Sequence, residues 1–600
     1  MDTQQKKTSE VSVERLDDIP LLIALQQRMG LSRIIDEAIP RHWLHQGLSL
    51  GQLVVGWNAY ILSQADHRKV AVEQWACEHQ QILSHMLGTG LRRTDFTDDR
   101  LSQVLSHLAD EAAWRTIENE LWQNSVSVYQ LMPERVRLDA SRFSGYHTPV
   151  DDGLMQHGYN AKTPELTQVK LMTASIDCGT SGHLLSTDVV SGEKADDPLY
   201  QPMIQNVRQT LNVRGLLYIG DSKMSAIETR AQLAASGDFY LMPLAKVGDV
   251  SKLFDECITP LVTGSQPATL IYTTDDSGQP DQLIAAGYQT TRSQTTQLPD
   301  DESYTWSERI LVVRSLAQAK KQFATLKANL EKATEALRTL TPSPGRGRKQ
   351  IRTEEKLIEK ADAILAKYKV ADFLHYTYHR DESVKTSYIG QGRGSANRQK
   401  RQVTTVRYHM TKVTRDEAMI HQAYQRMGFR LYATNQPEKQ LPLDSAVLLY
   451  RAAPRIERNF HLFKAAPIGI SPMYVKNDDQ IKGLTRLLSL CVRLLTLIEI
   501  VSRRRLKAEG QTLAGLYEGN PTRETNQPTA TRLLHAFRGI DCVRFANRAS
   551  PYTTPLNDLQ RNILSLLSIN EAVYQPKPPE SRWVILGKRC GQLFAKIRYG

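Results

Sequence analysis

The sequence predicts an α/β protein: a mixed-sheet core that carries an inserted β-rich and helical domain, between helical N-terminal and C-terminal regions. Short runs rich in Val, Ile, Leu and Tyr fill residues 134–245 and predict strands. A polar, charged segment interrupts this pattern at 250–440, and apolar residues recur at three- and four-residue spacing before residue 130. A chain of 600 residues also exceeds one ordinary hydrophobic core.

The N-terminal residues, 1–130, are expected to form a helical DNA-binding region. "DDIPLLIALQQRMGLSRIIDEAI" and "TDDRLSQVLSHLADEAAWRTIENELW" both have the apolar spacing of amphipathic helices. His67-Arg68-Lys69 and Arg92-Arg93 lie near the expected turns and favour a nucleic-acid interface. A plain helical bundle with a solvated charged surface remains the alternative.

Residues 131–248 are expected to form the first part of the core. "RVRLDASRF", "QVKLMTASID", "HLLSTDVVSG", "RGLLYIGDSKM" and "DFYLMPLA" predict five strands. Helical stretches separate the third from the fourth run and the fourth from the fifth. Three consecutive strands followed by helix, strand, helix and strand describe a mixed sheet, and this element order resembles the ribonuclease H-like fold.

Residues 249–440 are expected to form the inserted domain, which contains a charged helical pair. The connector of this pair, "TPSPGRGRKQIRT", is a Pro/Gly break that carries Arg346, Arg348 and Lys349, and we expect these side chains to contact DNA. Residues 441–505 are expected to complete the core with a glutamate-bearing helix, and residues 506–600 to form the C-terminal region.

Composition indicates the partner and the compartment. The chain has 76 Lys and Arg against 64 Asp and Glu, a net charge of +12 spread along its length. This favours a polyanionic partner, and we expect double-stranded DNA. Six scattered cysteines without a C-x-x-C pair suit a reducing cytosol. Residues 484–500 are apolar but contain Arg486, Arg493 and Glu499, so a buried helix is predicted and a membrane span is not.

Three carboxylates are the candidate catalytic residues. Asp139 follows Val136 and Leu138 in the first predicted strand, and Asp221 ends the fourth. An acid at the end of a strand faces the crevice where open α/β sheets bind ligands. With Glu457 of "PRIERNFHLFK", these residues could hold two Mg²⁺ or Mn²⁺ ions, which prefer carboxylate oxygens and serve phosphodiester chemistry. Each acid alone is explained equally well as a turn, capping or salt-bridge residue.

The order Asp139, Asp221, Glu457 resembles the D-D-E core of bacterial insertion-sequence transposases. Glu457 and Lys464 match the E-x6-K half of the Y-x2-R-x3-E-x6-K signature of the fourth insertion-sequence superfamily, and Tyr450 lies at its Tyr position. Position 453 is Ala where that signature has Arg, a role that Arg451 or Arg455 could fill. "GYNAKTPELTQVK", "FRLYATN" and "GLYEGNPTRETNQPTATRLLHAF" are also similar to segments of one branch of these enzymes.

The resemblance implies a DNA transposase that binds the terminal inverted repeats of an insertion sequence, cleaves at the element ends and joins the 3′-OH to target DNA. It implies two Mg²⁺ or Mn²⁺ ions at Asp139, Asp221 and Glu457, a homodimer on DNA, and a bacterial, cytoplasmic, nucleoid-associated location. DNA contacts are expected from Tyr450, Arg451, Arg455 and Lys464. A structure-selective metal nuclease and a catalytically inactive transposase-derived DNA-binding protein are the alternatives.

The remaining candidates each have a structural alternative. Tyr450, Glu457 and Lys464 would share one face of an unbroken helix, but Pro454 either starts or kinks it. Trp306 could stack on a flipped base in DNA or pack in the inserted domain. His375 and His379 have the spacing of a helical metal pair, although their surroundings predict a strand. "GQGRG" at 390–394 indicates a basic loop, and Asp177 is a rival carboxylate.

Overall fold

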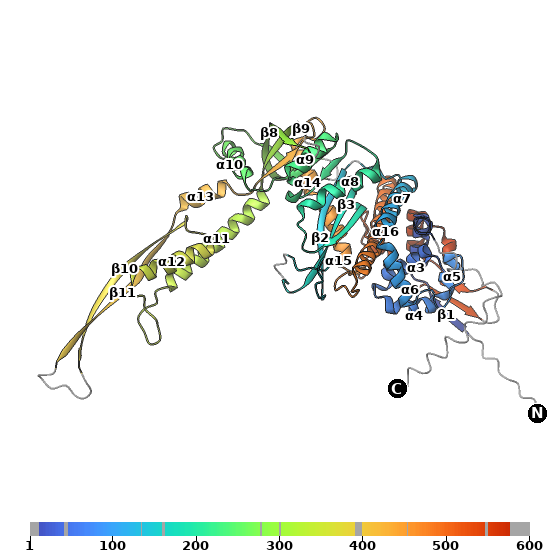
Figure 1. Cartoon of the computed structure of the whole chain (residues 1–600), viewed down its shortest axis with the longest axis horizontal. Coiled ribbons are helices and arrows are strands. Elements are labelled where there is room, and N and C mark those ends of the chain that lie inside the picture. The colour runs from blue at the N-terminus through green and yellow to red at the C-terminus, as the bar shows by residue number, and fades with distance from the viewer. Residues whose placement is uncertain are drawn as a thin grey trace, which may run out of the picture. The chain divides into compact units, whose positions relative to one another are not determined.

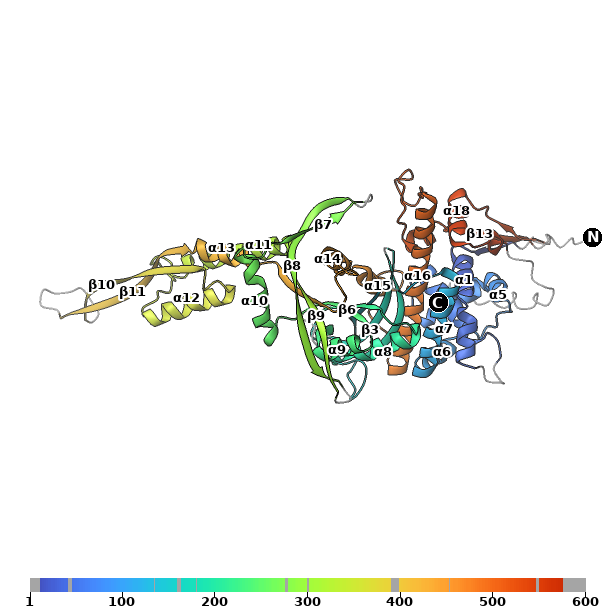
Figure 2. The same cartoon turned by 90° about the horizontal axis from the view of Figure 1, so that it is seen from above.

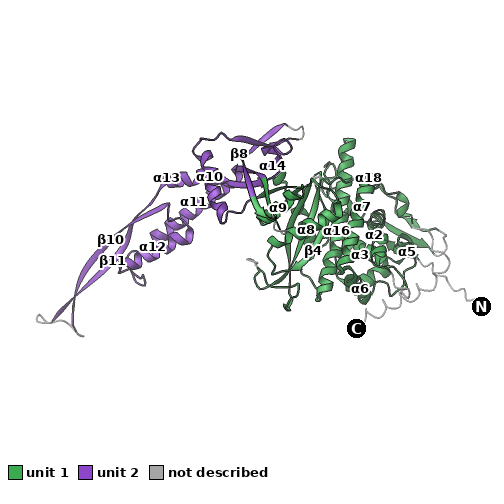
Figure 3. Ribbon diagram, turned by 45° about the horizontal axis from the view of Figure 1, so that its top comes forward, with its two compact units in different colours: residues 1–242, 295–306, 449–600 green, residues 243–294, 307–448 purple. Residues whose placement is uncertain are grey.

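The computed structural model describes residues 11–40, 46–133, 135–158, 163–179, 181–275, 279–298, 302–389, 399–452, 454–545 and 550–575. The protein is a mixed α/β chain, as predicted (Figure 1). It divides into two compact units that interleave along the sequence (Figure 3). Unit 1 contains residues 1–242, 295–306 and 449–600, and unit 2 contains residues 243–294 and 307–448. The predicted division into five regions stays a prediction.

A mixed sheet forms the centre of unit 1, with strand order β4-β3-β2-β5-β6. These strands are β2 (Arg135–Gly145), β3 (Thr167–Cys178), β4 (Ser181–Ser191), β5 (Leu217–Ile219) and β6 (Phe239–Pro243). The pairs β2–β3 and β3–β4 are antiparallel, whereas β5 runs parallel to β2 and to β6. Helix α8 (Tyr200–Leu211) connects β4 to β5, and α9 (Ile227–Ala235) connects β5 to β6, which confirms the predicted order of elements.

A long helix, α16 (Asp478–Glu509), explains how charged residues fit into an apolar stretch. Arg486 donates to the carbonyl oxygens of Leu108 and Ala109 at 2.9 and 2.8 Å. Arg493 forms an ion pair with Glu118, and both side chains are almost fully buried. The predicted buried helix is therefore confirmed. Among the described residues, no helix is both long and apolar enough to cross a membrane.

Helices dominate the N-terminal part of unit 1. They are α1 (Ile19–Arg28), α2 (Leu31–Ala38), α3 (Leu50–Gln64), α4 (Val72–Glu78), α5 (Gln80–Leu87), α6 (Asp98–Leu108) and α7 (Glu111–Tyr129). The helical prediction is wrong at its beginning, because β1 (Val11–Arg15) is a strand. This strand pairs with β13 (Asp541–Phe545), which pairs with β14 (Tyr552–Thr553). Two further helices, α17 (Ala530–His535) and α18 (Asp558–Leu567), complete the C-terminal part.

Unit 2 contains a sheet and a long arm. The sheet has the order β12-β9-β8-β7 and consists of β7 (Thr269–Thr274), β8 (Pro280–Gln297), β9 (Ser303–Ser315) and β12 (Phe429–Thr434). Helices α10 (Asp249–Val262), α13 (Glu417–Gln425) and α14 (Leu443–Arg451) accompany it. The tip of the β8–β9 hairpin, Thr295–Trp306, is part of unit 1.

The arm of unit 2 contains the predicted charged helical pair, α11 (Leu316–Thr339) and α12 (Glu354–Tyr368). An antiparallel ribbon of β10 (Leu374–Tyr388) and β11 (Lys400–Arg415) follows. Buried apolar side chains of both helices pack with Val370, Leu374 and Ile420 to form a local core. The ribbon continues beyond the helices in both views (Figures 1 and 2).

Candidate active site

Asp139 and Asp221 lie level with each other on neighbouring parallel strands. The register pairs Arg137 of β2 with Ile219 of β5, and each aspartate lies two residues beyond this pair. Parallel strands are about 4.8 Å apart, so the two backbones bring the carboxylates to one place on the sheet. Asp221 follows the end of β5, as predicted. The prediction that Asp139 ends its strand is wrong, because β2 continues to Gly145 in its pairing with β3.

Hydrogen bonds orient the Asp221 side chain. Its Oδ1 accepts a bond of 2.6 Å from the hydroxyl of Tyr200 and a bond of 2.8 Å from the backbone N–H of Lys223. The second bond makes Asp221 the cap of a short 3₁₀ turn, so the capping alternative is also realised. Tyr200 is buried on α8, and the nearby Asp221 raises its pKa in addition to the effect of burial. Sequence reasoning missed Tyr200, which no local pattern distinguishes from a core tyrosine.

Glu457 lies in the first turn of α15 (Pro454–Lys464), and its side chain is exposed. The apolar face predicted for this helix is confirmed: Ile456, Phe460 and Phe463 are buried. Phe463 packs against Phe143 of β2, with ring centroids 5.6 Å apart. The helix is therefore fixed on the sheet by one face, while Glu457 belongs to the turn where the helix dipole favours an acid.

The charges of the other two predicted acids, Asp221 and Glu457, act on Asp139. The pKa of Asp139 is raised to about 7, mainly by burial and against a lowering contribution from the backbone N–H of Ala140. The charges of Asp221 and Glu457 contribute to this rise, and so does a fourth acid, Asp196. A half-buried carboxylate that faces further carboxylates is a strong candidate for a functional group.

Asp196 is the acid that the sequence did not indicate. It forms an ion pair of 2.8 Å with Lys170 of β3. Its position in "EKADDPLY", a polar turn before α8, is typical of a surface aspartate.

The carboxylate set suits a hard divalent cation in its chemistry, because Mg²⁺ and Mn²⁺ prefer oxygen ligands. A cation here would also offset the charge that raises the pKa of Asp139. However, within the described ranges no three His, Cys, Asp or Glu side chains are gathered closely enough to hold a metal ion. The three carboxylates are therefore of the chemical type that binds such a cation, and the charges of two of them act on Asp139. Their side chains, however, are not placed as ligands of one ion.

Asp177, the rival carboxylate, has a structural role. Its two oxygens accept hydrogen bonds of 2.7 and 2.9 Å from the guanidinium of Arg137. Arg455 adds a third bond of 3.0 Å from α15. Arg137 and Asp177 are both buried and neutralise each other, while Arg455 is partly exposed. It links β2, β3 and α15, and it explains why Arg455 faces the protein.

The predicted row of Tyr450, Glu457 and Lys464 is not one helix face. Tyr450 and Arg451 belong to the end of α14, and α15 begins at Pro454, which confirms that the proline starts a helix. Position 453 lies outside the described residues.

Lys464 remains on the same helix as Glu457. Its ammonium donates a bond of 2.7 Å to the hydroxyl of Ser141, two residues beyond Asp139. Burial and the charge of Arg142 lower the pKa of Lys464.

Trp306 is packed in this structure. Its side chain is 7% exposed, its indole N–H donates a bond of 2.8 Å to the hydroxyl of Tyr240, and its ring stacks on Tyr304. Of the two alternatives for Trp306, the structure therefore shows packing, and contact of this side chain with DNA stays a prediction.

The Trp306→Leu variant separates these two roles. Leucine stays apolar but removes both the aromatic ring and the N–H donor, so we expect a loss of about 2 to 4 kcal/mol in the free energy of unfolding. DNA affinity should stay within about twofold, which a fluorescence anisotropy titration beside a thermal melt can measure. A tenfold loss of affinity with an unchanged melting temperature would instead favour stacking on a base.

The other candidates lie in unit 2. The connector carries Arg346, Arg348 and Lys349 as exposed side chains. His375 and His379 lie on a strand, as predicted, and each is near a different aspartate rather than a shared ion site: Asp416 at 3.6 Å and Asp381 at 3.7 Å. The "GQGRG" segment at 390–394 falls outside the described residues.

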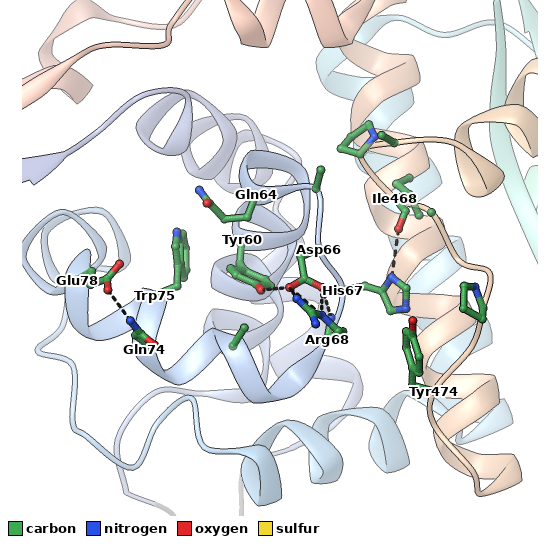
Figure 4. Close-up of a pocket in the computed structure, with 16 residues that line it drawn as sticks. Tyr60, Gln64, Asp66, His67, Arg68, Gln74, Trp75, Glu78, Ile468 and Tyr474 are labelled. Carbon is green, nitrogen blue, oxygen red and sulfur yellow. Dashed lines mark hydrogen bonds and ion pairs between the residues drawn. The ribbon is translucent and has the colours of Figure 1, made fainter. Parts of the chain in front are cut away.

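A separate cavity of about 660 Å³ lies in unit 1, between the α3–α4 region and the segment that follows α15 (Figure 4). His67 lines it, but its Nδ1 contacts the carbonyl oxygen of Ile468 at 3.3 Å, and burial lowers its pKa. Arg68 is engaged by Asp66 through three hydrogen bonds of 3.0 to 3.2 Å (Figure 4). The His67-Arg68 pair, which favoured a DNA interface, is thus largely occupied within the protein.

Comparisons with known proteins add little to this geometry. Residues 11–119, from β1 into α7, match a family described as a domain of unknown function, DUF4277. No curated protein matches the chain. The chain is similar to a piggyBac transposase, solved by cryo-EM as a synaptic complex with hairpin DNA, at 10% identity and a TM-score of 0.23. The match covers 50% of this chain and 63% of that chain, which is less than two thirds of its length.

Proposed function

We propose that unit 1 carries a ribonuclease H-like core and that the protein is a DNA transposase of the insertion-sequence type. In this proposal Asp139, Asp221 and Glu457 are the catalytic carboxylates. The observation that carries it is the raised pKa of Asp139, to which both other acids contribute although they are distant from it in the sequence. The strand order β4-β3-β2-β5-β6, with one antiparallel half and one parallel half, supports the proposed core.

The carboxylates would hold Mg²⁺ or Mn²⁺. When bound, two such ions supply activation of an attacking oxygen and stabilisation of the leaving oxygen in phosphodiester transfer. Tyr200 orients one oxygen of Asp221 through its hydroxyl. The cluster of Arg137, Asp177 and Arg455 holds β2 and α15 at a fixed spacing, and so sets the distance from Asp139 to Glu457. Positioning of this kind is a large part of catalysis in phosphoryl transfer.

Cationic side chains lie beside the carboxylates and would contact the phosphates of DNA. Lys464 is held by Ser141 on β2, two residues beyond Asp139, and Arg142 is close enough to lower its pKa. A phosphate that approached Asp139 would meet both cations. We therefore propose that Lys464 and Arg142 contact phosphates of the DNA strand that is cut. Such phosphate contacts position nucleic acid without reading its sequence. Tyr450 and Arg451 stay candidates for further backbone contacts.

An assay with purified protein tests this function. The substrate is a plasmid in which the DNA that flanks this gene brackets a marker, incubated with Mg²⁺ and a target plasmid. We expect cleavage at the flanks and joining of the freed 3′-OH to the target. Cleavage without joining would favour a structure-selective nuclease, and binding without cleavage would favour an inactive transposase-derived DNA-binding protein.

The Glu457→Gln variant tests the third carboxylate in the same assay. We expect at least about a hundredfold loss of both cleavage and joining, the scale on which removing one active-site electrostatic group acts. Glu228→Gln is the matched control, because Glu228 is an exposed glutamate in the first turn of another helix of the same unit, α9. Full activity of Glu457→Gln would remove this residue from the site.

A further inference from the structure

The outer end of the unit 2 arm is a two-stranded ribbon whose described residues are all exposed. We define the distal ribbon as residues 384–389 and 399–404, which pair from Val384 with Thr404 to Tyr388 with Lys400. The pairing continues to Ile389, whose backbone N–H donates a bond of 3.1 Å to the carbonyl oxygen of Gln399. Every residue of the distal ribbon is exposed, including the large apolar side chains Val384, Tyr388 and Val403. An isolated two-stranded ribbon is at best marginally stable in water, so this one fits a binding role.

Charge is divided along the ribbon. In the inner part, Asp381 and Glu382 are both paired with bases: Arg380 contacts Glu382 at 3.1 Å, and Asp381 contacts Arg407 at 3.8 Å. The distal ribbon carries three bases, Lys385, Lys400 and Arg401, and no acid. None of these three bases has a carboxylate partner among the ion pairs of the described residues, although Lys400 lies over the ring of Tyr388. The end of the arm is therefore a cationic ribbon.

The connector between α11 and α12 extends this charge. Its exposed bases are Arg346, Arg348, Lys349 and Arg352, and its sequence, "TPSPGRGRKQIRT", contains no acid. It is docked on β11, because Ile351 forms a β-bridge with Tyr408 and the hydroxyl of Thr341 accepts a bond of 2.8 Å from the N–H of Met410. Seven residues separate Tyr408 from Arg401, or about 24 Å at a rise of about 3.4 Å per residue.

We propose that the distal ribbon enters the major groove of double-stranded DNA while the connector bases contact phosphates beside it. This inference rests on the proposed function, which makes DNA the substrate. The major groove of B-DNA admits a two-stranded ribbon. A distance of about 24 Å corresponds to about seven nucleotides of one strand at about 3.4 Å each, so both basic groups can follow one duplex. Lys385, Lys400 and Arg401 lie on both strands of the ribbon and contact the phosphates that line the groove.

Salt dependence of DNA binding tests the ribbon. The variant Lys385→Gln/Lys400→Gln/Arg401→Gln is compared with the wild type by anisotropy, using a fluorescent DNA duplex of arbitrary sequence in EDTA. Loss of three phosphate contacts should reduce the slope of log K against log salt by about 2.7. Between about 50 and about 200 mM salt, the wild type should then lose about 40-fold more affinity than the variant. An unchanged slope would overturn the proposal.

A second triple variant controls for net charge. Lys320→Gln/Lys321→Gln/Lys327→Gln removes the same charge from exposed positions on α11 of the same arm. We expect its slope to stay close to that of the wild type. An equal loss in both triple variants would show only a general charge effect and would contradict a ribbon site. Circular dichroism of both variants checks that the arm remains folded.

Groove entry has its own measurement. Dimethyl sulfate methylates N7 of guanine in the major groove, and we expect the wild type to protect this atom and the ribbon variant to lose the protection. An RNA duplex of the same sequence should bind more weakly, because the major groove of A-form RNA is too narrow for side chains. Equal binding to RNA, or absence of protection, would contradict groove entry. Because EDTA stops metal-dependent cleavage, failure here is distinct from failure of the proposed catalysis.

Discussion

Asp139→Asn is expected to abolish DNA cleavage while making the protein more stable above pH 7. Burial and the neighbouring charges of Asp221, Glu457 and Asp196 raise the pKa of Asp139 to about 7 in the folded protein. In the unfolded chain the same group titrates near its usual value of about 4. Between these two values the folded state holds a proton that the unfolded state has released, so stability falls as pH rises through this window.

Asparagine cannot ionise, so the variant escapes this cost. At pH 8 we expect the variant to gain roughly 2 to 4 kcal/mol in the free energy of unfolding, and the gain should vanish near pH 4. Thermal melts of both proteins between about pH 4 and about pH 8 measure this difference in stability. Glu228→Gln, which changes an exposed acid, should follow the wild type at every pH. A destabilised Asp139→Asn variant at pH 8 would contradict the crowded carboxylate site.

Asp177→Ala is expected to destabilise unit 1 by roughly 3 to 5 kcal/mol, because it leaves the buried guanidinium of Arg137 without its counter-charge. Two hydrogen bonds to Arg137 and one to Arg455 are lost together. Since the cluster also fixes α15 against β2, cleavage should fall with stability. Urea unfolding followed by tryptophan fluorescence measures the first effect.

A double replacement distinguishes this positioning role from a direct catalytic one. Arg137→Met/Asp177→Leu exchanges the buried ion pair for apolar side chains, which often restores stability. Arg455 is partly exposed and can reach water when its partner is removed. We expect at least half of the lost stability to return, with partial recovery of cleavage. A stable double variant with no cleavage would contradict the positioning role and favour a direct catalytic role for Asp177.

Local patterns predicted the elements that local forces determine. In β2, Val136 and Leu138 alternate with charged residues up to Asp139, and the run before Asp221 is continuously apolar. Helix α15 has a regular apolar face with a proline at its start. Alignment of Asp139 with Asp221 follows from the parallel register, which the order of elements already suggested. The charged helical pair was equally clear from its spacing and its Pro/Gly connector.

Contacts between distant parts of the chain escaped prediction. β1 pairs with β13 across more than five hundred residues, for instance Val13 with Val543, and neither strand shows which partner it needs. Asp196 and Tyr200 approach the site from a turn and a helix whose sequences are ordinary. His67 lies in a basic triplet near an expected turn, but packing against the segment around Ile468 buries it. Such outcomes depend on tertiary packing, which the local spacing of residues does not encode.

The central claim is that Asp139, Asp221 and Glu457 form one site for divalent cations. Crystals grown or soaked with Mn²⁺, with anomalous diffraction recorded at the manganese edge, test this claim most directly. We predict anomalous density between Asp139 and Asp221, with the Glu457 side chain turned toward it, and none there in Asp139→Asn crystals. Manganese bound elsewhere, or density at these residues that survives the Asp139→Asn change, would contradict the account.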